Sequence, residues 1–396
     1  PQFNWGYDPV NYNVPEGSYS SDPYNGAVRV KELKQMIQTL HENNINVIMD
    51  VVYNHVYDAG AFSFNQIVPD YFSRTAADGS YSSTSGCGND TASERDMVRK
   101  FIVESVVYWA EEYHMDGFRF DLVGLLDTIT INQIVEEVHD INPSIVFYGE
   151  GWDMDSTLTS KDVDMAKQGN ASKTPGFAYF SDTIRDKIKG KNTEDENDSE
   201  FLGYVNGGAH LESVIEDGMM GKTWWSETPS QIVNYASCHD NYTLKDKINV
   251  STKNDTSEDA EANRIKMNNL SAAIYMLAEG IPLIHAGEEM LRTKVDYDGT
   301  IIHNSYNASD YVNNIDWSDL NDEAYQDVVD YYAGLIEFRK NHESLRLDTK
   351  EQVDAYVSKS WVTDNVMVFK YKGKASVPGE ISDGIVVILN SNKQAS

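Results

Sequence analysis

Between residues 28 and 286 the sequence alternates short apolar runs with longer amphipathic segments, and this alternation constrains the fold most. Residues 28–43 carry apolar side chains at helical spacing, whereas 45–52 is a short β-branched run typical of a buried strand. Further helices are predicted at 93–114, 129–141 and 259–279, and further strands at 116–121, 145–149, 231–237 and 281–286. Strands that alternate with helices predict βα units and a parallel sheet. At least five such strands favour an α/β barrel of the (β/α)8, TIM type over an open sheet.

The pattern changes after a predicted helix at 322–342. The runs at 360–363, 366–372 and 385–389 resemble antiparallel strands, separated by turn-forming residues. We therefore expect a barrel domain over residues 1–342 and the start of an all-β sandwich domain over 343–396. A chain of 396 residues is long enough for two domains.

The composition excludes several classes of partner. A formal net charge of -31 disfavours nucleic acid and anionic membranes, because both require a basic surface. No apolar run approaches the ~20 residues of a membrane span. The two cysteines, Cys87 and Cys238, indicate neither a disulfide framework nor a metal cluster.

Two predicted strands end in residues suited to acid–base and nucleophilic chemistry. Arg119 and Asp121 are two positions apart, so on a strand they face the same way. A neighbouring guanidinium lowers the pKa of a carboxyl, so Asp121 is expected to be an ionised nucleophile. Glu150 follows the apolar run 145–148, and an apolar setting would raise its pKa and make it a general acid.

Other strand ends carry polar residues as well. Residues 50–55 (DVVYNH) end the strand at 45–52, and His239 with Asp240 follows the strand at 231–237. Catalytic residues of parallel barrels gather at the carboxyl ends of the strands. Glycoside hydrolases use a pair of carboxylates that flank the bond to be cleaved. Trp152, two positions after Glu150, is either core packing or a platform for a sugar ring.

These segments resemble a known enzyme family. Residues 50–55 (DVVYNH), 117–121 (GFRFD), 149–150 (GE) and 239–240 (HD) are similar to the four motif regions of the alpha-amylase family of glycoside hydrolases. Residues 3–9 (FNWGYDP) resemble the signature of its type I pullulanases, and 305–310 (SYNASD) resembles their late barrel loop. The resemblance covers almost the whole chain.

The resemblance implies a role for each matching residue. Asp121 would be the nucleophile, Glu150 the general acid/base, and Asp240 the residue that orients the sugar and stabilises the transition state. Arg119 would hold Asp121. Further substrate contacts would be made by His55, His239, Tyr7 and Asp310. Trp152 would be a platform for a sugar ring. In a retaining enzyme the Asp121 and Glu150 carboxyl groups would lie about 5–5.5 Å apart.

The implied activity is debranching of α-glucans. The substrate would be pullulan, limit dextrin or amylopectin, cleaved at α-1,6 links by a retaining double displacement. The alternatives are an isoamylase, an α-1,4-acting amylase of the same family, or a non-catalytic or inactive glucan-binding fragment. No cofactor is required by this chemistry. A structural calcium ion is left open, with the acidic loop at 190–200 as its candidate site.

The family comparison also suggests that the sequence is a fragment. The family places two barrel strands before the 3–9 segment and continues its C-terminal sandwich past the position of Ser396. We therefore expect residues 1–27 to run as a loop over the active-site face and the strand at 45–51 to be unpaired on one side. Such a fragment would be poorly soluble and weakly active. An extracellular or cell-surface location is expected, with a cytoplasmic one left open.

Overall fold

The computed structural model describes residues 4–154, 162–191 and 201–392, and these form two compact units. One unit comprises Gly6–Tyr179, and the other comprises Pro1–Trp5 with Phe180–Ser396. Each unit is described by itself.

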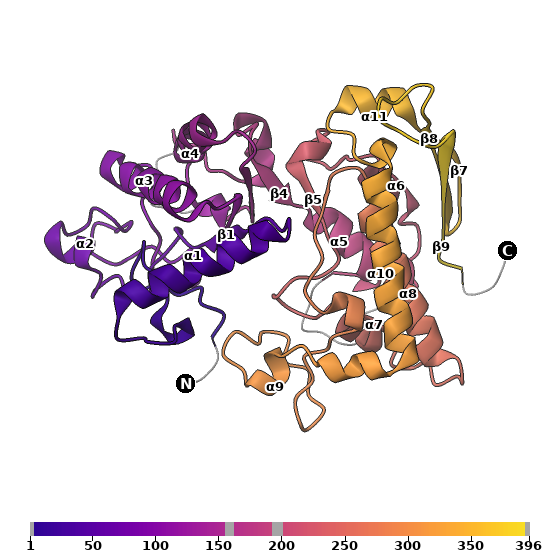
Figure 1. Cartoon of the computed structure of the whole chain (residues 1–396), viewed down its shortest axis with the longest axis horizontal. Coiled ribbons are helices and arrows are strands. Elements are labelled where there is room, and N and C mark those ends of the chain that lie inside the picture. The colour runs from indigo at the N-terminus through magenta and orange to yellow at the C-terminus, as the bar shows by residue number, and fades with distance from the viewer. Residues whose placement is uncertain (1–3, 155–161, 192–200, 393–396) are drawn as a thin grey trace. The chain divides into compact units, whose positions relative to one another are not determined.

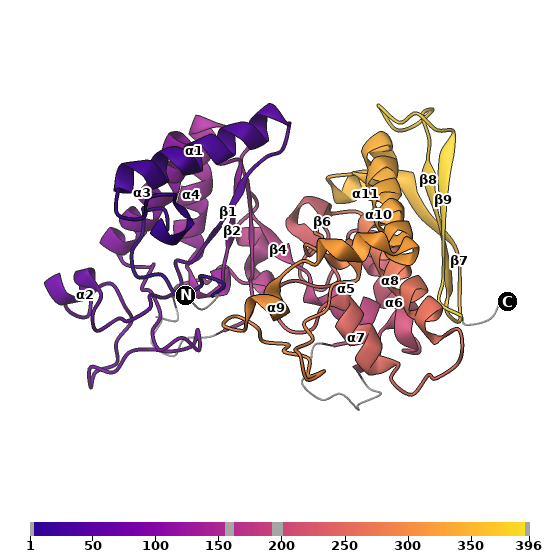
Figure 2. The same ribbon diagram turned by 60° about the horizontal axis from the view of Figure 1, so that its bottom comes forward.

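The unit Gly6–Tyr179 is built on parallel strands with helices around them (Figure 1). Strand β1 pairs with β2, β2 with β3, and β3 with β4, all in parallel. The strands are β1 (Ile48–Val51), β2 (Gly117–Phe120), β3 (Val146–Gly149) and β4 (Ala178–Phe180), the last ending at the boundary between the units. The helices are α1 (Gly26–Glu42), α2 (Ser63–Ile67), α3 (Asp96–Tyr113) and α4 (Thr128–Ile141). In Figure 2, helices α1, α3 and α4 lie on one side of β1 and β2.

The local sequence explains where these elements begin and end. Helix α3 buries Val98, Ile102 and Val106, which are four residues apart and so lie on one face. It stops at His114, whose left-handed backbone (φ 55°) cannot continue a helix. All four residues of β2 are buried, as a central strand of a parallel sheet requires.

The unit containing Phe180–Ser396 combines helices with two sets of strands. Its parallel strands β5 (Ile232–Asn234) and β6 (Ile281–Pro282) pair with each other. Strands β7 (Val357–Thr363), β8 (Val366–Lys372) and β9 (Gly384–Asn390) form an antiparallel sheet. Its helices are α5 (Asp182–Lys189), α6 (Glu212–Met219), α7 (Leu244–Ser251), α8 (Ala260–Leu277), α9 (Asp310–Asn313), α10 (Glu323–Asn341) and α11 (Lys350–Tyr356).

The predicted βα alternation and the later antiparallel strands are both confirmed. The predicted elements all appear, most with ends shifted by one to three residues, although β6 has only two residues. Strand β4 and helices α2, α5, α6, α7, α9 and α11 were not predicted. One apolar core joins α8 to the antiparallel sheet, because Ile274 and Tyr275 belong to the same buried cluster as Phe369 and Leu389. The domain boundary expected after residue 342 stays a prediction.

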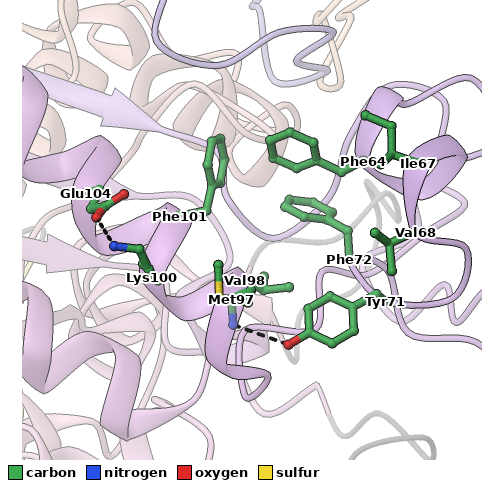
Figure 3. A pocket seen from close by; sticks show the side chains of 10 residues that line it. All are labelled: Phe64, Ile67, Val68, Tyr71, Phe72, Met97, Val98, Lys100, Phe101 and Glu104. Atoms are coloured by element: carbon green, nitrogen blue, oxygen red, sulfur yellow. Dashed lines mark hydrogen bonds and ion pairs between the residues drawn. The ribbon is translucent and has the colours of Figure 1, made fainter.

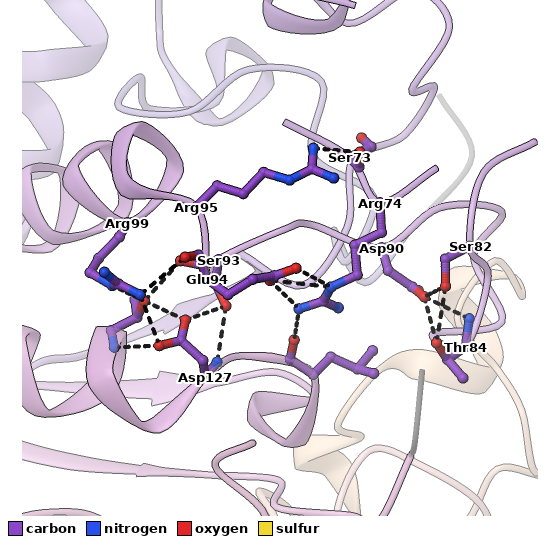
Figure 4. Close-up of polar contacts among 12 residues, drawn as sticks. Ser73, Arg74, Ser82, Thr84, Asp90, Ser93, Glu94, Arg95, Arg99 and Asp127 are labelled. Carbon is purple, nitrogen blue, oxygen red and sulfur yellow. Dashed lines mark hydrogen bonds and ion pairs between the residues drawn. The ribbon is translucent and has the colours of Figure 1, made fainter. Parts of the chain in front are cut away.

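Residues 73–91 are held by polar contacts rather than by an apolar core (Figure 4). Backbone bridges join Ser73 to Thr91 and Thr75 to Tyr81. The Asp90 carboxylate accepts hydrogen bonds from the hydroxyls of Ser82 and Thr84. The hydrogen bonds to the carboxylate favour its charged form, and the pKa of Asp90 is lowered although burial alone would raise it.

Asp127 is the centre of a second buried network in the same view (Figure 4). Its side chain caps α4 by accepting from the Thr130 N–H at 3.0 Å, and it also accepts from the hydroxyls of Ser93 at 2.8 Å and Thr130 at 2.6 Å. Arg99 lies 3.4 Å from the same carboxylate. Asp127, Ser93 and Thr130 are fully buried, so the two hydroxyls lose a buried acceptor when Asp127 is removed.

Asp127→Ala is therefore expected to lower the free energy of unfolding by roughly 2–4 kcal/mol. The change removes an N-cap and leaves buried donors unsatisfied. Chemical denaturation monitored by circular dichroism measures it, with Asp140→Ala, an exposed carboxylate on the same helix, as the control. A loss below about 0.5 kcal/mol, the size of an ordinary surface change, would contradict the network's role.

Glu279 is a buried carboxyl at the end of α8 with few partners. It accepts from the Leu347 N–H at 2.9 Å, while its other oxygen has no hydrogen-bond partner among the described residues. Burial raises the pKa of Glu279 to about 8. The folded state therefore binds a proton between pH 4.5, the ordinary value, and pH 8, where the unfolded state does not.

The stability of the protein is thus expected to fall as pH rises from about 5 to 8, and Glu279→Gln should flatten this fall. Glutamine imitates the protonated carboxyl and cannot ionise. Urea unfolding at a series of pH values measures the slope, with Glu323→Gln, an exposed glutamate, as the control. Parallel pH curves for wild type and Glu279→Gln would refute this explanation.

Candidate active site

Three carboxylates surround one buried guanidinium at the carboxyl ends of neighbouring strands. Asp50 is opposite Arg119 in the β1–β2 register, and Glu150 directly follows β3. Arg119 Nη1 lies 2.8 Å from Asp50 Oδ1 and 3.2 Å from Asp121 Oδ1, and Arg119 Nη2 lies 2.9 Å from Glu150 Oε1. Arg119, Asp121 and Glu150 are 5%, 9% and 4% exposed. The predicted pairing of Arg119 with Asp121 is present.

Asp121 is fixed by more than Arg119. Its Oδ2 accepts a hydrogen bond from Asn54 Nδ2 at 2.7 Å, and the same amide donates to the Asp121 carbonyl at 2.9 Å. Asn54 is fully buried and also lies 2.5 Å from His55 Nδ1. Burial lowers the pKa of His55, so its imidazole is neutral at neutral pH. Asn54 thus joins His55 to the predicted nucleophile.

Glu150 has polar partners where the sequence suggested an apolar setting. Besides the Arg119 guanidinium, the Leu122 N–H donates to its Oε2 at 3.2 Å. Both contacts stabilise a negative carboxylate. The expected apolar residues are present in the strand before Glu150, but the contacts of the Glu150 carboxylate itself are polar.

Arg119 stays charged in this setting. Burial alone would lower the pKa of Arg119, but the carboxylates of Glu150 and Asp50 raise it well above its usual range. Tyr7 extends the cluster: its hydroxyl donates to Asp50 Oδ2 at 2.5 Å and its ring lies 5.3 Å from the guanidinium. Burial, opposed in part by the Arg119 charge and reinforced by Asp50, raises the pKa of the Tyr7 hydroxyl. The predicted substrate contact Tyr7 therefore lies beside the carboxylates.

Two glycines allow the strand ends to pack this closely. A Cβ on Gly149 would lie 2.4 Å from the Phe120 carbonyl oxygen, and one on Gly124 would lie 2.1 Å from the Trp152 carbonyl oxygen. The Gly124 N–H also donates to the Glu150 carbonyl at 3.1 Å. The backbone that carries Glu150 and Trp152 is thus pressed against the turn after β2. Whether the Trp152 ring serves a sugar stays a prediction.

The other predicted residues belong to the unit containing Phe180–Ser396. His239 and Asp240 follow β5, with His239 Nε2 3.8 Å from Asp240 Oδ1, and Asp310 begins α9. The His239 ring contacts the Trp5 ring edge to face, with centroids 4.8 Å apart. The convergence of Asp240 with Asp121 and Glu150, and the 5–5.5 Å carboxyl spacing, stay predictions.

Lys294 was not predicted, yet it shapes the segment around Asp240. Its fully buried ammonium donates to the His239 carbonyl, to the Asn241 carbonyl at 2.8 Å and to the His303 carbonyl at 3.0 Å. It also lies 5.1 Å from the Trp5 ring. The bonded carbonyls flank Asp240, and Asn241 has a left-handed backbone (φ 59°). A lysine far along the sequence gives no signal of this role.

An apolar pocket of about 280 Å³ lies elsewhere in the unit Gly6–Tyr179 (Figure 3). Aromatic and aliphatic side chains of α2 and α3 line it, including Phe64, Met97 and Phe101. It shares no lining residue with the Arg119 cluster and contains no carboxylate pair. It is therefore not the candidate active site.

Several sequence-based exclusions concern the described part of the chain. Within residues 4–154, 162–191 and 201–392, no three His, Cys, Asp or Glu side chains are grouped so that they could hold a metal ion. Most of the acidic segment at 190–200 considered for calcium lies outside the described residues, as does Phe3. In the same ranges, no helix has the length and apolar character needed to cross a membrane. Neither Cys87 nor Cys238 forms a disulfide bond.

Known proteins resemble this chain in sequence and in structure. No family model matches the sequence. The pullulanase of Bacillus subtilis (strain 168) is 37% identical over 374 residues, which are 93% of this chain. The crystal structure of the pullulanase from Paenibacillus barengoltzii with maltohexaose and alpha-cyclodextrin superposes with a TM-score of 0.90 at 42% identity over 99% of this chain.

The chain is similar to pullulanases over most of its length.

The match also confirms the predicted fold class, an α/β barrel type followed by β-strands. The pullulanase of Klebsiella pneumoniae is more distant, at 34% identity over 370 residues. The chain spans 50% of the length of the Bacillus subtilis pullulanase, 33% of the Klebsiella pneumoniae one and 59% of the Paenibacillus barengoltzii structure.

Proposed function

We propose that this chain hydrolyses α-1,6-glucosidic links of branched α-glucans by a retaining double displacement. One observation carries the proposal: Asp121 and Glu150 contact two nitrogens of one buried guanidinium at adjacent strand ends. That arrangement gives a nucleophile and an acid/base on neighbouring strands, as a retaining glycosidase needs. The relatives named pullulanase support the α-1,6 link, and the maltohexaose in the Paenibacillus barengoltzii structure supports an α-glucan substrate.

In the first step Asp121 attacks the anomeric carbon, and the bond to the glycosidic oxygen breaks. Glu150 gives its proton to that oxygen, so the leaving sugar departs neutral. In the second step Glu150 takes a proton from water, which attacks the same carbon and frees Asp121. Asp240 would stabilise the transition state, while His55 and His239 would bind sugar hydroxyls. This mechanism requires no cofactor.

Glu150 can act as an acid only when it carries a proton. The 2.9 Å contact with Arg119 favours the anion, so we propose that substrate binding weakens this contact. Asp50 would then hold the guanidinium in place, because its own 2.8 Å contact with Arg119 does not involve Glu150.

Digestion of pullulan tests the proposal. Pullulan consists of maltotriose units joined by α-1,6 links, so α-1,6 cleavage yields maltotriose, whereas α-1,4 cleavage yields trisaccharides that retain an α-1,6 link. Chromatography distinguishes them, and proton NMR of the first product should show the α-anomer. Asp121→Asn, which keeps the shape of the nucleophile, is the control. A β-anomer, or no maltotriose, would overturn the proposal.

An isoamylase activity is the second candidate. The isoamylase SU1 of Zea mays is 26% identical over 402 residues, a weaker match than the pullulanases. Debranching of amylopectin without cleavage of pullulan would favour it.

We also propose an extracellular or cell-surface location, supported by the acidic composition. Fractionation of the source cells tests this location.

A further inference from the structure

Two tyrosines on the unit containing Asp240 form an exposed stacked pair. The rings of Tyr297 and Tyr311 have centroids 3.8 Å apart and planes inclined by 17°. Tyr297 is 79% exposed and Tyr311 46% exposed. One face of Tyr297 is covered by its neighbour, so its exposure comes from the other face and the edge. Aromatic surface left open in this way is available to a flat apolar ligand surface.

A short hairpin over residues 294–302 fixes Tyr297. Val295 and Ile301 form an antiparallel bridge, and the Ile302 N–H donates to the Lys294 carbonyl at 2.9 Å. The turn closes at Gly299, whose backbone (φ 86°) suits glycine. The Tyr297 N–H also donates to the Asp296 carboxylate at 2.8 Å. Because the ring is already held, little conformational entropy is lost when a ligand stacks on it.

This hairpin begins at Lys294, the lysine that holds the Asp240 segment. Lys294 donates to the carbonyls of His239 and Asn241, on either side of Asp240. Tyr297 is three positions after Lys294, a span of at most about 11 Å in an extended chain. The stacked pair is therefore joined through Lys294 to the segment that carries Asp240, within the same unit.

The surroundings of the pair indicate the kind of ligand. Asp296 and Asp298 flank Tyr297, and Asp310 precedes Tyr311. Carboxylates repel anions and accept hydrogen bonds from hydroxyl groups. A glucose ring combines an apolar C–H face, which stacks on an aromatic ring, with hydroxyls at its edge.

We propose that the Tyr297–Tyr311 pair binds one glucose ring of an α-glucan, as a subsite away from the bond that is cleaved. The proposal rests on the proposed function for its substrate class. It assigns a binding role to Tyr297 and Tyr311, which the motif regions do not include, and leaves the roles of Asp121 and Glu150 unchanged.

Three variants test it. Tyr297→Ala removes the platform, Tyr297→Phe keeps the ring, and Tyr24→Ala removes a tyrosine that is 99% exposed on the other unit. Calorimetric titration with maltohexaose gives Kd for each, and pullulan digestion gives kcat and KM. Tyr297→Ala is expected to weaken maltohexaose binding about threefold to tenfold, the worth of one aromatic contact, and to raise KM similarly. Tyr297→Phe and Tyr24→Ala should match the wild type.

The outcomes separate this proposal from the proposed function. Equal maltohexaose affinity in Tyr297→Ala and wild type, with wild-type pullulan hydrolysis intact, would overturn the subsite alone. A loss of affinity in Tyr297→Ala, in a protein that does not cleave pullulan, would support the subsite and overturn the proposed function. An equal loss in Tyr24→Ala, or no binding to the wild type, would also overturn the subsite.

Discussion

Glu150→Gln is expected to lower kcat for pullulan hydrolysis by roughly 10²–10⁴-fold, the usual contribution of a general acid/base. Glutamine keeps the shape and can still accept from the Leu122 N–H, so the fold around residue 150 should persist. It cannot give a proton to the leaving oxygen. Initial rates of maltotriose release measure the effect, with Glu136→Gln, an exposed glutamate of the same unit, as the control.

A substrate with a better leaving group distinguishes loss of the acid from loss of the fold. Fluoride departs without protonation, so an α-glucosyl fluoride should restore much of the first step in Glu150→Gln. The same substrate should not rescue Asp121→Asn, because no nucleophile remains. Equal loss on pullulan and on the fluoride in Glu150→Gln would show that Glu150 does not act as the acid.

The sequence predicted the strands and long helices because their periodicity is strong. Helix α3 and strand β2 have continuous apolar patterns over their full lengths, and their ends coincide with residues that stop them, such as His114. Helix α5 and strand β4 were missed because they are short. Strand β4 has three residues, and the eight residues of α5 are dominated by charge, so neither gives a full period of apolar side chains.

The candidate site was predicted in part for a related reason. Spacing within one strand places Arg119 beside Asp121, which needs no knowledge of the neighbouring strands. The contacts of Arg119 with Asp50 and Glu150 depend on the register of β1, β2 and β3, which the sequence does not fix. Asn54 was passed over because an asparagine after a strand usually forms a turn.

Arg119→Met is expected to lower the free energy of unfolding by about 3–5 kcal/mol near neutral pH, as well as to abolish hydrolysis. The family resemblance gave Arg119 only the role of holding Asp121. The structure shows it contacting three carboxylates, and methionine would leave Asp50, Asp121 and Glu150 with no cation between them. Removing the cation that contacts all three carboxylates affects the fold as well as the chemistry.

The pH dependence of this loss identifies its cause. Without Arg119, the carboxylates of Asp50, Asp121 and Glu150 repel one another in the folded state, and proton uptake relieves this repulsion. The folded variant then binds more protons than the unfolded chain, so its stability rises as pH falls from 7 towards about 4. The difference in the free energy of unfolding between wild type and Arg119→Met should therefore become smaller as the pH is lowered. Urea unfolding across this pH range measures the difference in stability, with Arg29→Met as the control. Arg119→Lys keeps the charge, so it is expected to recover most of the stability and little of the rate. A gap that stays constant with pH would mean that Arg119 acts by packing and not by charge.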